Sequence, residues 1–237
     1  MNVLVVGGMG FIGSNLCRLL EERGVPFSMV DLKKGIDVCS VDASSFDVIV
    51  LLAADLKHDR RMYSANLRIY NWLARHTAHI IYTSSAAVYG DGMVAHVEDE
   101  PTPAPTLYGK SKLLGETIIK DTQPNWTIFR LANVYGDGDG NGVIDIFKRG
   151  GNKIYGDGED VRDYVSVHKV VSAIASVIKS PMSHNKQTYN ISSFVPTTTY
   201  KAFCDYGSGL PEYVEGRGFD VHYSLLNNTK AKEAGLL

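Results

Sequence analysis

The chain has 237 residues, of which 44% are hydrophobic and 21% charged, a composition typical of a globular protein with one sizeable core. Its formal net charge of -2 leaves no large basic field, so nucleic acid is not expected as a partner. The first residues lead directly into an apolar strand, and the longest clean apolar run, residues 48–54, is far too short to cross a bilayer. We therefore expect no membrane contact and a cytoplasmic location. The three scattered cysteines favour reduced thiols over a disulfide framework.

The first motif is the glycine-rich turn GGMGFIG at residues 7–13, which follows an apolar strand and opens an amphipathic helix that continues to about Arg23. Because glycine has no Cβ, Gly7, Gly10 and Gly13 permit a tight turn, a close approach to a pyrophosphate and close packing of the helix on its strand. The N–H groups at the start of a helix also favour an anion. The strand, turn and helix together predict a dinucleotide site.

The second strand, residues 26–31, ends in Asp31, about twenty residues after the glycines. A carboxylate at this place can accept hydrogen bonds from both hydroxyls of an adenosine ribose and would repel a 2′-phosphate, which favours NAD over NADP. The alternative is an aspartate that only caps a turn. Lys33 and Lys34 follow directly and could soften the preference.

Residues 46–54 form a continuous apolar strand of the kind buried on both faces of a parallel sheet, and the small Ala53 and Ala54 at its end leave room for a cofactor. A long helix over 59–76 and a strand over 79–83 follow. This alternation predicts an α/β fold with a Rossmann-like, doubly wound parallel sheet.

The segment SSAAVYG at residues 84–90 brings hydroxyl groups to the carboxyl end of a strand, the edge at which such sheets bind ligands. A helix over 108–122 then carries Tyr108 and Lys112 four residues apart, on one face. A free phenol has a pKa of about 10, and a nearby ammonium or a cationic nicotinamide ring lowers that pKa. In isolation such a tyrosine usually packs and such a lysine faces solvent, so the acid–base hypothesis depends on Ser85 and the glycine turn.

These motifs resemble the extended short-chain dehydrogenases/reductases, the NAD-dependent epimerase/dehydratase family that acts on nucleotide sugars. The resemblance covers nearly the whole chain and includes GGMGFIGS at 7–14, LLAA at 51–54, SSAAVYG at 84–90 and RLANVYG at 130–136. It implies that Ser85, Tyr108 and Lys112 are catalytic and that Asn66 supports the active-site strand. The residues implied to bind the cofactor are Gly7, Gly10, Phe11, Ile12, Gly13, Asp31, Leu52, Ala53, Ala54, Tyr108 and Lys112.

The resemblance also implies a substrate site for a sugar diphosphate, formed by Ser85, Asn133, Arg162 and Arg217. Guanidinium groups suit this role because they bind phosphate oxygens in bidentate fashion without a metal. For either arginine alone, a surface salt bridge is the alternative. The small Ser224 lies near where relatives set the room for a C2 substituent, and it would permit an N-acetyl group.

By this resemblance, residues 1–136 form the NAD-binding domain, residues 163–182 pack back onto it, and residues 137–237 form a small, reduced substrate lobe interleaved with it. The chain is short for the family and departs from it at three positions, with His168 for Asp, Ser192 for Gly and Phe219 for Pro. Residues 137–145 imitate the start of a calcium loop, but Lys148 stands where the bidentate Glu is needed, so no metal is expected.

The hypothesis is therefore an NAD-dependent epimerase that acts at C4 of a UDP-linked hexose through a transient 4-keto intermediate. A 4,6-dehydratase is less favoured because Ala86 and Ala87 stand where the family's dehydratases have Asp-Glu. A reductase or a decarboxylating relative stays open. A non-catalytic NAD-binding sensor or scaffold could dispense with Tyr108 and Lys112, which this chain keeps. The resemblance implies a homodimer through the helices at 59–76 and 108–122.

Overall fold

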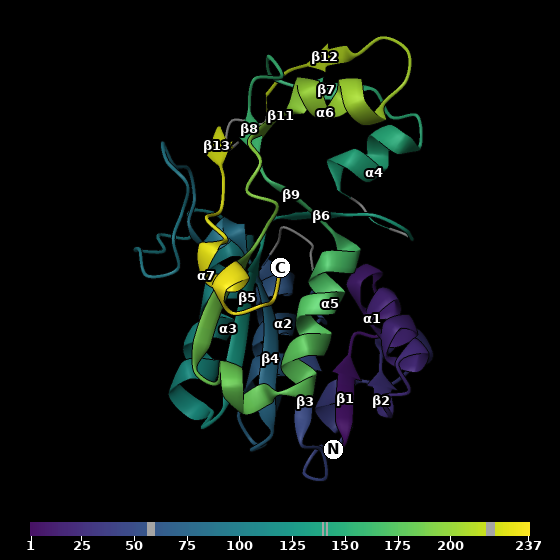
Figure 1. The fold of residues 1–237 in the computed structure, drawn as a ribbon, viewed down its shortest axis with the longest axis vertical. Coiled ribbons are helices and arrows are strands. Elements are labelled where there is room, and N and C mark those ends of the chain that lie inside the picture. Colours follow the sequence, from purple (N-terminus) through teal and green to yellow (C-terminus); the bar gives the residue numbers. More distant parts are fainter. Residues whose placement is uncertain (56–59, 139, 141, 217–220) are drawn as a thin grey trace.

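The computed structural model describes residues 1–55, 60–138, 140, 142–216 and 221–237, and at its centre these residues form a six-stranded sheet in the order β10-β5-β4-β3-β1-β2 (Figure 1). All neighbouring strands of this sheet run parallel. The strands are β1 Val3–Val6, β2 Phe27–Val30, β3 Val48–Leu51, β4 His79–Ser85, β5 Trp126–Leu131 and β10 Gln187–Ile191. The Rossmann-like sheet expected from the sequence is thus confirmed.

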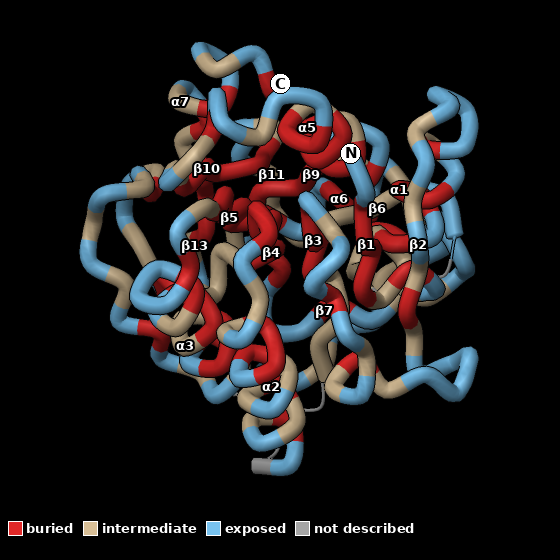
Figure 2. The backbone as a smooth tube through the Cα atoms, turned by 90° about the horizontal axis from the view of Figure 1, so that it is seen from below, coloured by how far each residue is buried: buried red, intermediate tan, exposed pale blue. Residues whose placement is uncertain are grey.

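Helices cover both faces of the sheet, which explains why β1 and β3 are apolar at every position (Figure 1). Val3 and Val5 of β1 belong to a core cluster that also contains residues of α1 (Phe11–Glu22) and α5 (Val167–Lys179). Leu4 and Val6 point to the opposite face and belong to a second cluster, with residues of α2 (Arg60–Leu73) and α3 (Leu107–Thr122). Figure 2 shows β1, β3, β4 and β5 in the colour of buried residues at the centre of the molecule.

A smaller group of elements lies beyond the carboxyl ends of the sheet strands (Figure 1). It includes β7 (Lys153–Tyr155) paired with β12 (Glu212–Val214), and β8 (Val161–Arg162) between β11 (Thr197–Thr198) and β13 (Tyr223–Ser224). Its own apolar core includes Phe147 of α4 (Val143–Lys148) and Phe203 of α6 (Thr199–Tyr206), whose rings meet edge to face at 5.2 Å. The pair β6 (Asn133–Tyr135) and β9 (Tyr164–Ser166) connects this lobe to the main sheet.

The chain returns from the small lobe through β9 directly into α5, which packs against α1. After α5 come β10, at the edge of the sheet, and the short helix α7 (Thr229–Glu233), which packs on it. The segment between β10 and β11 and the segment between β13 and α7 therefore connect the main sheet with the small lobe.

Several predicted boundaries differ from the structure. Strand β3 ends at Leu51 rather than at residue 54, because the backbone amides of Leu52 and Ala53 both donate to the carbonyl of Val6 and turn the chain out of the strand. Strand β4 continues two residues beyond the predicted end and reaches Ser85. Helix α2 ends at Leu73 rather than His76, and residue 59, its predicted start, lies outside the described residues.

Two kinds of feature are absent from the described residues. None of the helices there has the length and apolarity of a membrane span. No group of three or more His, Cys, Asp or Glu side chains in the same residues is arranged to hold a metal ion.

Replacement of Ile174 by Ala should lower the free energy of unfolding by about 2–5 kcal/mol, because this fully buried side chain of α5 packs in the core shared with α1 and the sheet. The exposed Lys169 of the same helix is the control, and K169A should change that free energy by no more than about 0.5 kcal/mol. Urea denaturation followed by circular dichroism measures both values. Equal stability of the two variants would contradict the packing of α5.

Candidate active site at the carboxyl edge of the sheet

The glycine turn after β1 is packed so closely that two of its positions exclude a side chain. A Cβ on Gly13 would lie 2.1 Å from the carbonyl oxygen of Gly7, and a Cβ on Gly7 would lie 2.7 Å from the backbone nitrogen of Ala53. Gly7 also has a φ of +88°, which favours glycine. Helix α1 starts directly after this turn, and its N-cap residue Gly10 supplies no side-chain hydrogen bond. The helix N-terminus is thus left without a side-chain cap, and such a helix end suits the pyrophosphate of a dinucleotide.

Asp31 lies beside this turn, at the end of β2. One carboxylate oxygen accepts the backbone N–H of Met9 at 2.9 Å and the other accepts that of Lys33 at 2.8 Å. The Lys33 ammonium donates to the Met9 carbonyl at 3.2 Å. Asp31 therefore caps a turn, as one alternative from the sequence has it. Its carboxylate also retains lone pairs that can accept the ribose hydroxyls, so the two roles are compatible.

The other residues predicted to bind the cofactor surround the same turn. Leu52, Ala53 and Ala54 follow β3 and are partly buried, and Phe11 and Ile12 pack on the core at the start of α1. The fold thus brings the ends of β1, β2 and β3 together in one cradle that has the backbone approach and the carboxylate that NAD requires.

Three successive residues of β4 contact three residues of α3 that lie one turn apart. The hydroxyl of Ser85 is hydrogen-bonded to Tyr108, and the Lys112 ammonium donates to the Thr83 carbonyl at 2.9 Å. The Ser84 hydroxyl donates to the Glu116 carboxylate at 2.6 Å. The structure therefore brings the three predicted catalytic residues together, and it adds Glu116.

Helix α3 can approach β4 because of its first turn. Thr106 is the N-cap, and its hydroxyl accepts the N–H of Gly109 at 3.0 Å. A Cβ on Gly109 would lie 2.3 Å from the Ala87 carbonyl oxygen, in the 3₁₀ turn that follows Ser85. The sequence analysis did not single out Gly109, although a glycine directly after Tyr108, at the start of a helix, is the available signal.

The electrostatic environment of Tyr108 and Lys112 favours their uncharged forms. Burial raises the pKa of Tyr108 to about 12, and the hydrogen bond with Ser85 opposes this shift. Burial lowers the pKa of Lys112 to about 8, and the negative charge of Glu116 opposes that shift. The Lys112 ammonium lies 5.9 Å from the centre of the Tyr108 ring. Without further positive charge, Tyr108 is therefore protonated at neutral pH.

Asn66 of α2 connects the end of β3 with α3. Its amide oxygen accepts the backbone N–H of Asp55 at 2.8 Å, and its amide nitrogen donates to the Asp55 carbonyl and to the Ser111 hydroxyl, at 3.1 and 3.0 Å. The side chain is fully buried. Asn66 therefore makes a supporting contact between these elements.

The predicted substrate residues are less clearly assembled. The Asn133 side chain donates to the Asp163 carbonyl at 3.0 Å, where β6 pairs with β9. Arg162 lies in β8 and pairs with Asp160, Nη2 to Oδ2 at 3.4 Å. The predicted Arg217 lies outside the described residues. Ser224 of β13 is opposite Arg162 in the register, and it is mostly buried.

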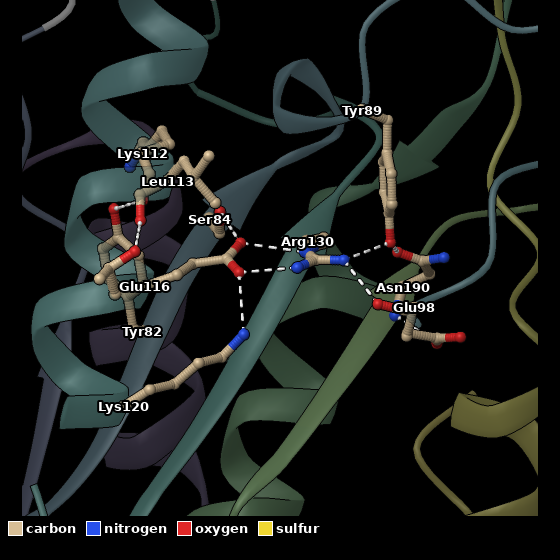
Figure 3. A network of polar contacts seen from close by, with 11 residues as sticks. Tyr82, Ser84, Tyr89, Glu98, Lys112, Leu113, Glu116, Lys120, Arg130 and Asn190 are labelled. Carbon is tan, nitrogen blue, oxygen red and sulfur yellow. Dashed lines mark hydrogen bonds and ion pairs between the residues drawn. The ribbon is translucent and has the colours of Figure 1, made fainter. Parts of the chain in front are cut away.

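The sequence analysis did not predict a buried ion pair between α3 and β5. Arg130 of β5 donates from Nε and Nη2 to the two carboxylate oxygens of Glu116, at 3.0 and 2.8 Å (Figure 3). The two side chains are only 4% and 1% exposed. Two features of the sequence could have indicated this pair. Arg130 is a charged residue within an otherwise apolar strand, and Glu116 is a carboxylate one helical turn after Lys112.

The chain is similar to known proteins of one family. The family model described as the NAD dependent epimerase/dehydratase family matches residues 3–192. The UDP-glucose 4-epimerase of Mycolicibacterium smegmatis is 28% identical over an alignment of 289 residues, which covers 98% of this chain and 92% of the relative. A spore coat polysaccharide biosynthesis protein of Bacillus subtilis is 30% identical over 81% of this chain and 73% of its own. The first alignment is longer than this chain, so segments of that relative have no counterpart here.

Solved structures have the same fold. The UDP-glucose 4-epimerase of Thermotoga maritima with UDP-glucose gives a TM-score of 0.80 at 26% identity, over 99% of this chain and 93% of that one. The UDP-glucose 4-epimerase of Thermus thermophilus with NAD gives 0.83 at 22% identity, over 100% and 94%, and supports the fold.

Replacement of Gly13 by Ala should force α1 away from the glycine turn, because the new methyl group would overlap a carbonyl oxygen. We expect a loss of about 1–3 kcal/mol in the free energy of unfolding and at least about a tenfold loss of NAD affinity. Thermal denaturation and isothermal titration with NAD measure the two effects. R23A, at the exposed end of the same helix, is the control. An unchanged NAD affinity in G13A would contradict the cradle.

The carboxylate of Asp160, which pairs with Arg162, also contacts a histidine, and this contact can be tested. His222 lies 2.8 Å from the other oxygen of Asp160, and this hydrogen bond raises the pKa of His222. The contact therefore stabilises the fold below the unfolded-state pKa of histidine, and it is lost as the pH rises through the raised value. An NMR titration should give His222 a pKa above its ordinary value in the wild type and a lower one in D160N. Equal pKa values in the two proteins would show that the contact is absent in solution.

Proposed function

The chain belongs to the NAD-dependent epimerase/dehydratase family, and we propose that it is a nucleotide-sugar epimerase that inverts C4 of a UDP-linked hexose through a transient 4-keto sugar. The observation that carries the proposal is the arrangement of Ser85, Tyr108 and Lys112 at the carboxyl edge of the sheet, next to a glycine cradle. The names of similar proteins agree with it, since one is the UDP-glucose 4-epimerase of Mycolicibacterium smegmatis and another is a dTDP-L-rhamnose 4-epimerase of Burkholderia thailandensis.

NAD is the cofactor of this family. The cradle fits its pyrophosphate beside Gly7 and Gly13 and its adenosine ribose beside Asp31, and the small Ala53 leaves room next to the turn. When bound, the cofactor supplies an acceptor for the hydride at C4 of the sugar and then a donor that returns it.

In the proposed mechanism, Tyr108 acts as the general base and removes the proton of the C4 hydroxyl. Its own pKa must fall for this role, and the Lys112 ammonium, held by the Thr83 carbonyl, supplies one positive charge for that purpose. The Ser85 hydroxyl donates a hydrogen bond to the oxygen that becomes the ketone. Tyr108 then returns the proton after the sugar has turned its other face to the site.

We propose that the substrate diphosphate is held by Asn133, Arg162 and Arg217 while the sugar turns. Arg162 is paired with a carboxylate in the structure, so the diphosphate has to compete with Asp160 for the guanidinium. A guanidinium has five N–H donors and can serve two anions at once. A UDP-sugar is the favoured substrate because the named relatives include enzymes of UDP-sugars.

Two further features belong to the proposal. The first is the division into an NAD-binding domain over 1–136 and an interleaved substrate lobe over 137–237, with 163–182 packed on the former. The separate apolar core around Phe147 and Phe203 supports this division.

The second proposed feature is a homodimer through the outer faces of α2 and α3.

The family alternatives are less well supported. A dehydratase needs an additional acid and base beside the sugar ring, and Ala86 and Ala87 directly follow Ser85. A non-catalytic NAD sensor has no need for the contacts that Tyr108 and Lys112 make with β4. A reductase would use the same three residues, so only the product distinguishes it.

Replacement of Tyr108 by Phe should reduce turnover by about 10²–10⁴-fold and leave NAD binding intact, because only the proton acceptor is removed. The wild type and variant are incubated with UDP-, dTDP- and GDP-sugars, and the products are identified by proton NMR. Y213F, which changes an exposed tyrosine of the small lobe, should be as active as the wild type. Full activity of Y108F would overturn the assignment of the base, and a wild type that converts none of the sugars would favour the sensor.

A further inference from the structure

The carboxylate of Glu116 is the centre of a buried polar network (Figure 3). Besides the two bonds from Arg130, it accepts the Ser84 hydroxyl at 2.6 Å and the Lys120 ammonium at 3.3 Å. Burial alone would raise the pKa of Glu116, but the hydrogen bonds and charge of Arg130 outweigh it and lower the pKa overall. Glu116 is therefore ionised, and it joins α3 to β4 and β5 at once.

The position of Glu116 along the helix is the important feature. Tyr108, Lys112 and Glu116 follow each other at intervals of four residues and so lie along one face of α3. Their partners are three successive residues of β4, namely Ser85, Thr83 and Ser84. Glu116 receives four hydrogen bonds, one from Ser84 of β4, two from Arg130 of β5 and one from Lys120 of α3 itself.

Arg130 is itself fixed from the other side. Its Nη1 donates to the Tyr89 hydroxyl at 2.8 Å and to the Glu98 carbonyl at 2.9 Å, and the Tyr89 hydroxyl donates to Asn190 of β10 at 2.8 Å. The orientation of the guanidinium is thus fixed by Tyr89, which is itself bonded to β10, and by the Glu98 carbonyl in the segment after β4. A bidentate partner of such a group is constrained in direction as well as in distance.

Stability alone is a weak reason for this arrangement, since an apolar pair of similar volume is often as stable as a buried ion pair. What an apolar pair lacks is direction, because it would allow α3 to rotate or slide by small amounts. We infer that Glu116, together with Ser84 and Arg130, is a positioning residue that fixes the rotation of α3 and hence the placement of Tyr108 and Lys112 against Ser85. The inference rests on the proposed function of that site.

The charge of Glu116 has a second effect in the same direction. Burial lowers the pKa of Lys112, and the negative charge of Glu116 raises it. Removal of that charge should therefore lower the pKa of Lys112 further, so that the ammonium loses its proton at a lower pH. The alkaline limb of the activity profile should move to lower pH.

The test compares E116Q with D121N, which removes an exposed carboxylate from the same helix. E116Q should lose on the order of 10²-fold in kcat with little change in KM, and its alkaline limb should move to lower pH, whereas D121N should match the wild type. E116Q leaves Arg130 unpaired and could fail to fold, so the double variant E116M/R130M replaces the ion pair by an apolar pair. It should fold and show the same loss of kcat. A folded double variant with wild-type kcat would overturn the inference.

A measurement without sugar separates this inference from the proposed function. The crystal structure of E116M/R130M without sugar is compared with that of the wild type at the contact between the Lys112 ammonium and the Thr83 carbonyl, which is 2.9 Å long here. If Glu116 fixes the rotation of α3, this contact lengthens or is lost in the double variant. An unchanged contact would overturn the inference even if the wild type converts no sugar nucleotide, and that lack of conversion would refute only the proposed function.

Discussion

The whole site depends on how closely α3 packs against the carboxyl end of β4. Two glycines on the inner face of this helix make that distance possible. A Cβ on Gly109 would lie 2.3 Å from the Ala87 carbonyl oxygen, and one on Gly115 would lie 2.6 Å from the Tyr82 hydroxyl. Each glycine within a helix costs about 1 kcal/mol relative to alanine. Here that cost is offset by close packing, which allows the Lys112 ammonium to reach a backbone carbonyl of the strand.

The sequence predicted the parts of the site that follow one another along the chain. The glycine turn, Asp31 and the hydroxyls at the end of β4 each stand directly after an apolar strand, and parallel strands bring such ends to one edge. The pair Tyr108 and Lys112 is visible from helical spacing alone. The end of strand β4 could not be predicted from the sequence. Ser84 and Ser85 are polar, but they continue the strand by pairing with Arg130 and Leu131 of β5.

The contacts that the sequence did not reveal are those between distant segments or to backbone atoms. The partner of Lys112 is a carbonyl oxygen, which any residue could supply at Thr83. The partner of Arg162 is Asp160, which also binds His222, more than sixty residues away in the chain. Sequence spacing carries no information about the contact between Asp160 and His222, whereas Asp160 lies only two residues before Arg162, and their ion pair is the salt-bridge alternative that the sequence left open.

A buried carboxylate at the junction between the main sheet and the small lobe helps to hold the lobe in place. Asp163 is only 1% exposed, and its oxygens accept the backbone N–H groups of Ser193 and Leu226 at 3.1 and 3.2 Å. Burial raises its pKa, although these hydrogen bonds oppose that shift. The hydroxyl of Ser192, where the family usually has glycine, donates to the Leu226 carbonyl at 2.9 Å. Asp163 and the residues beside it therefore join three segments of the chain. These segments lie after β8, after β10 and before α7. Because the Asp163 carbonyl also accepts the Asn133 side chain, the same corner sets the position of a proposed substrate residue.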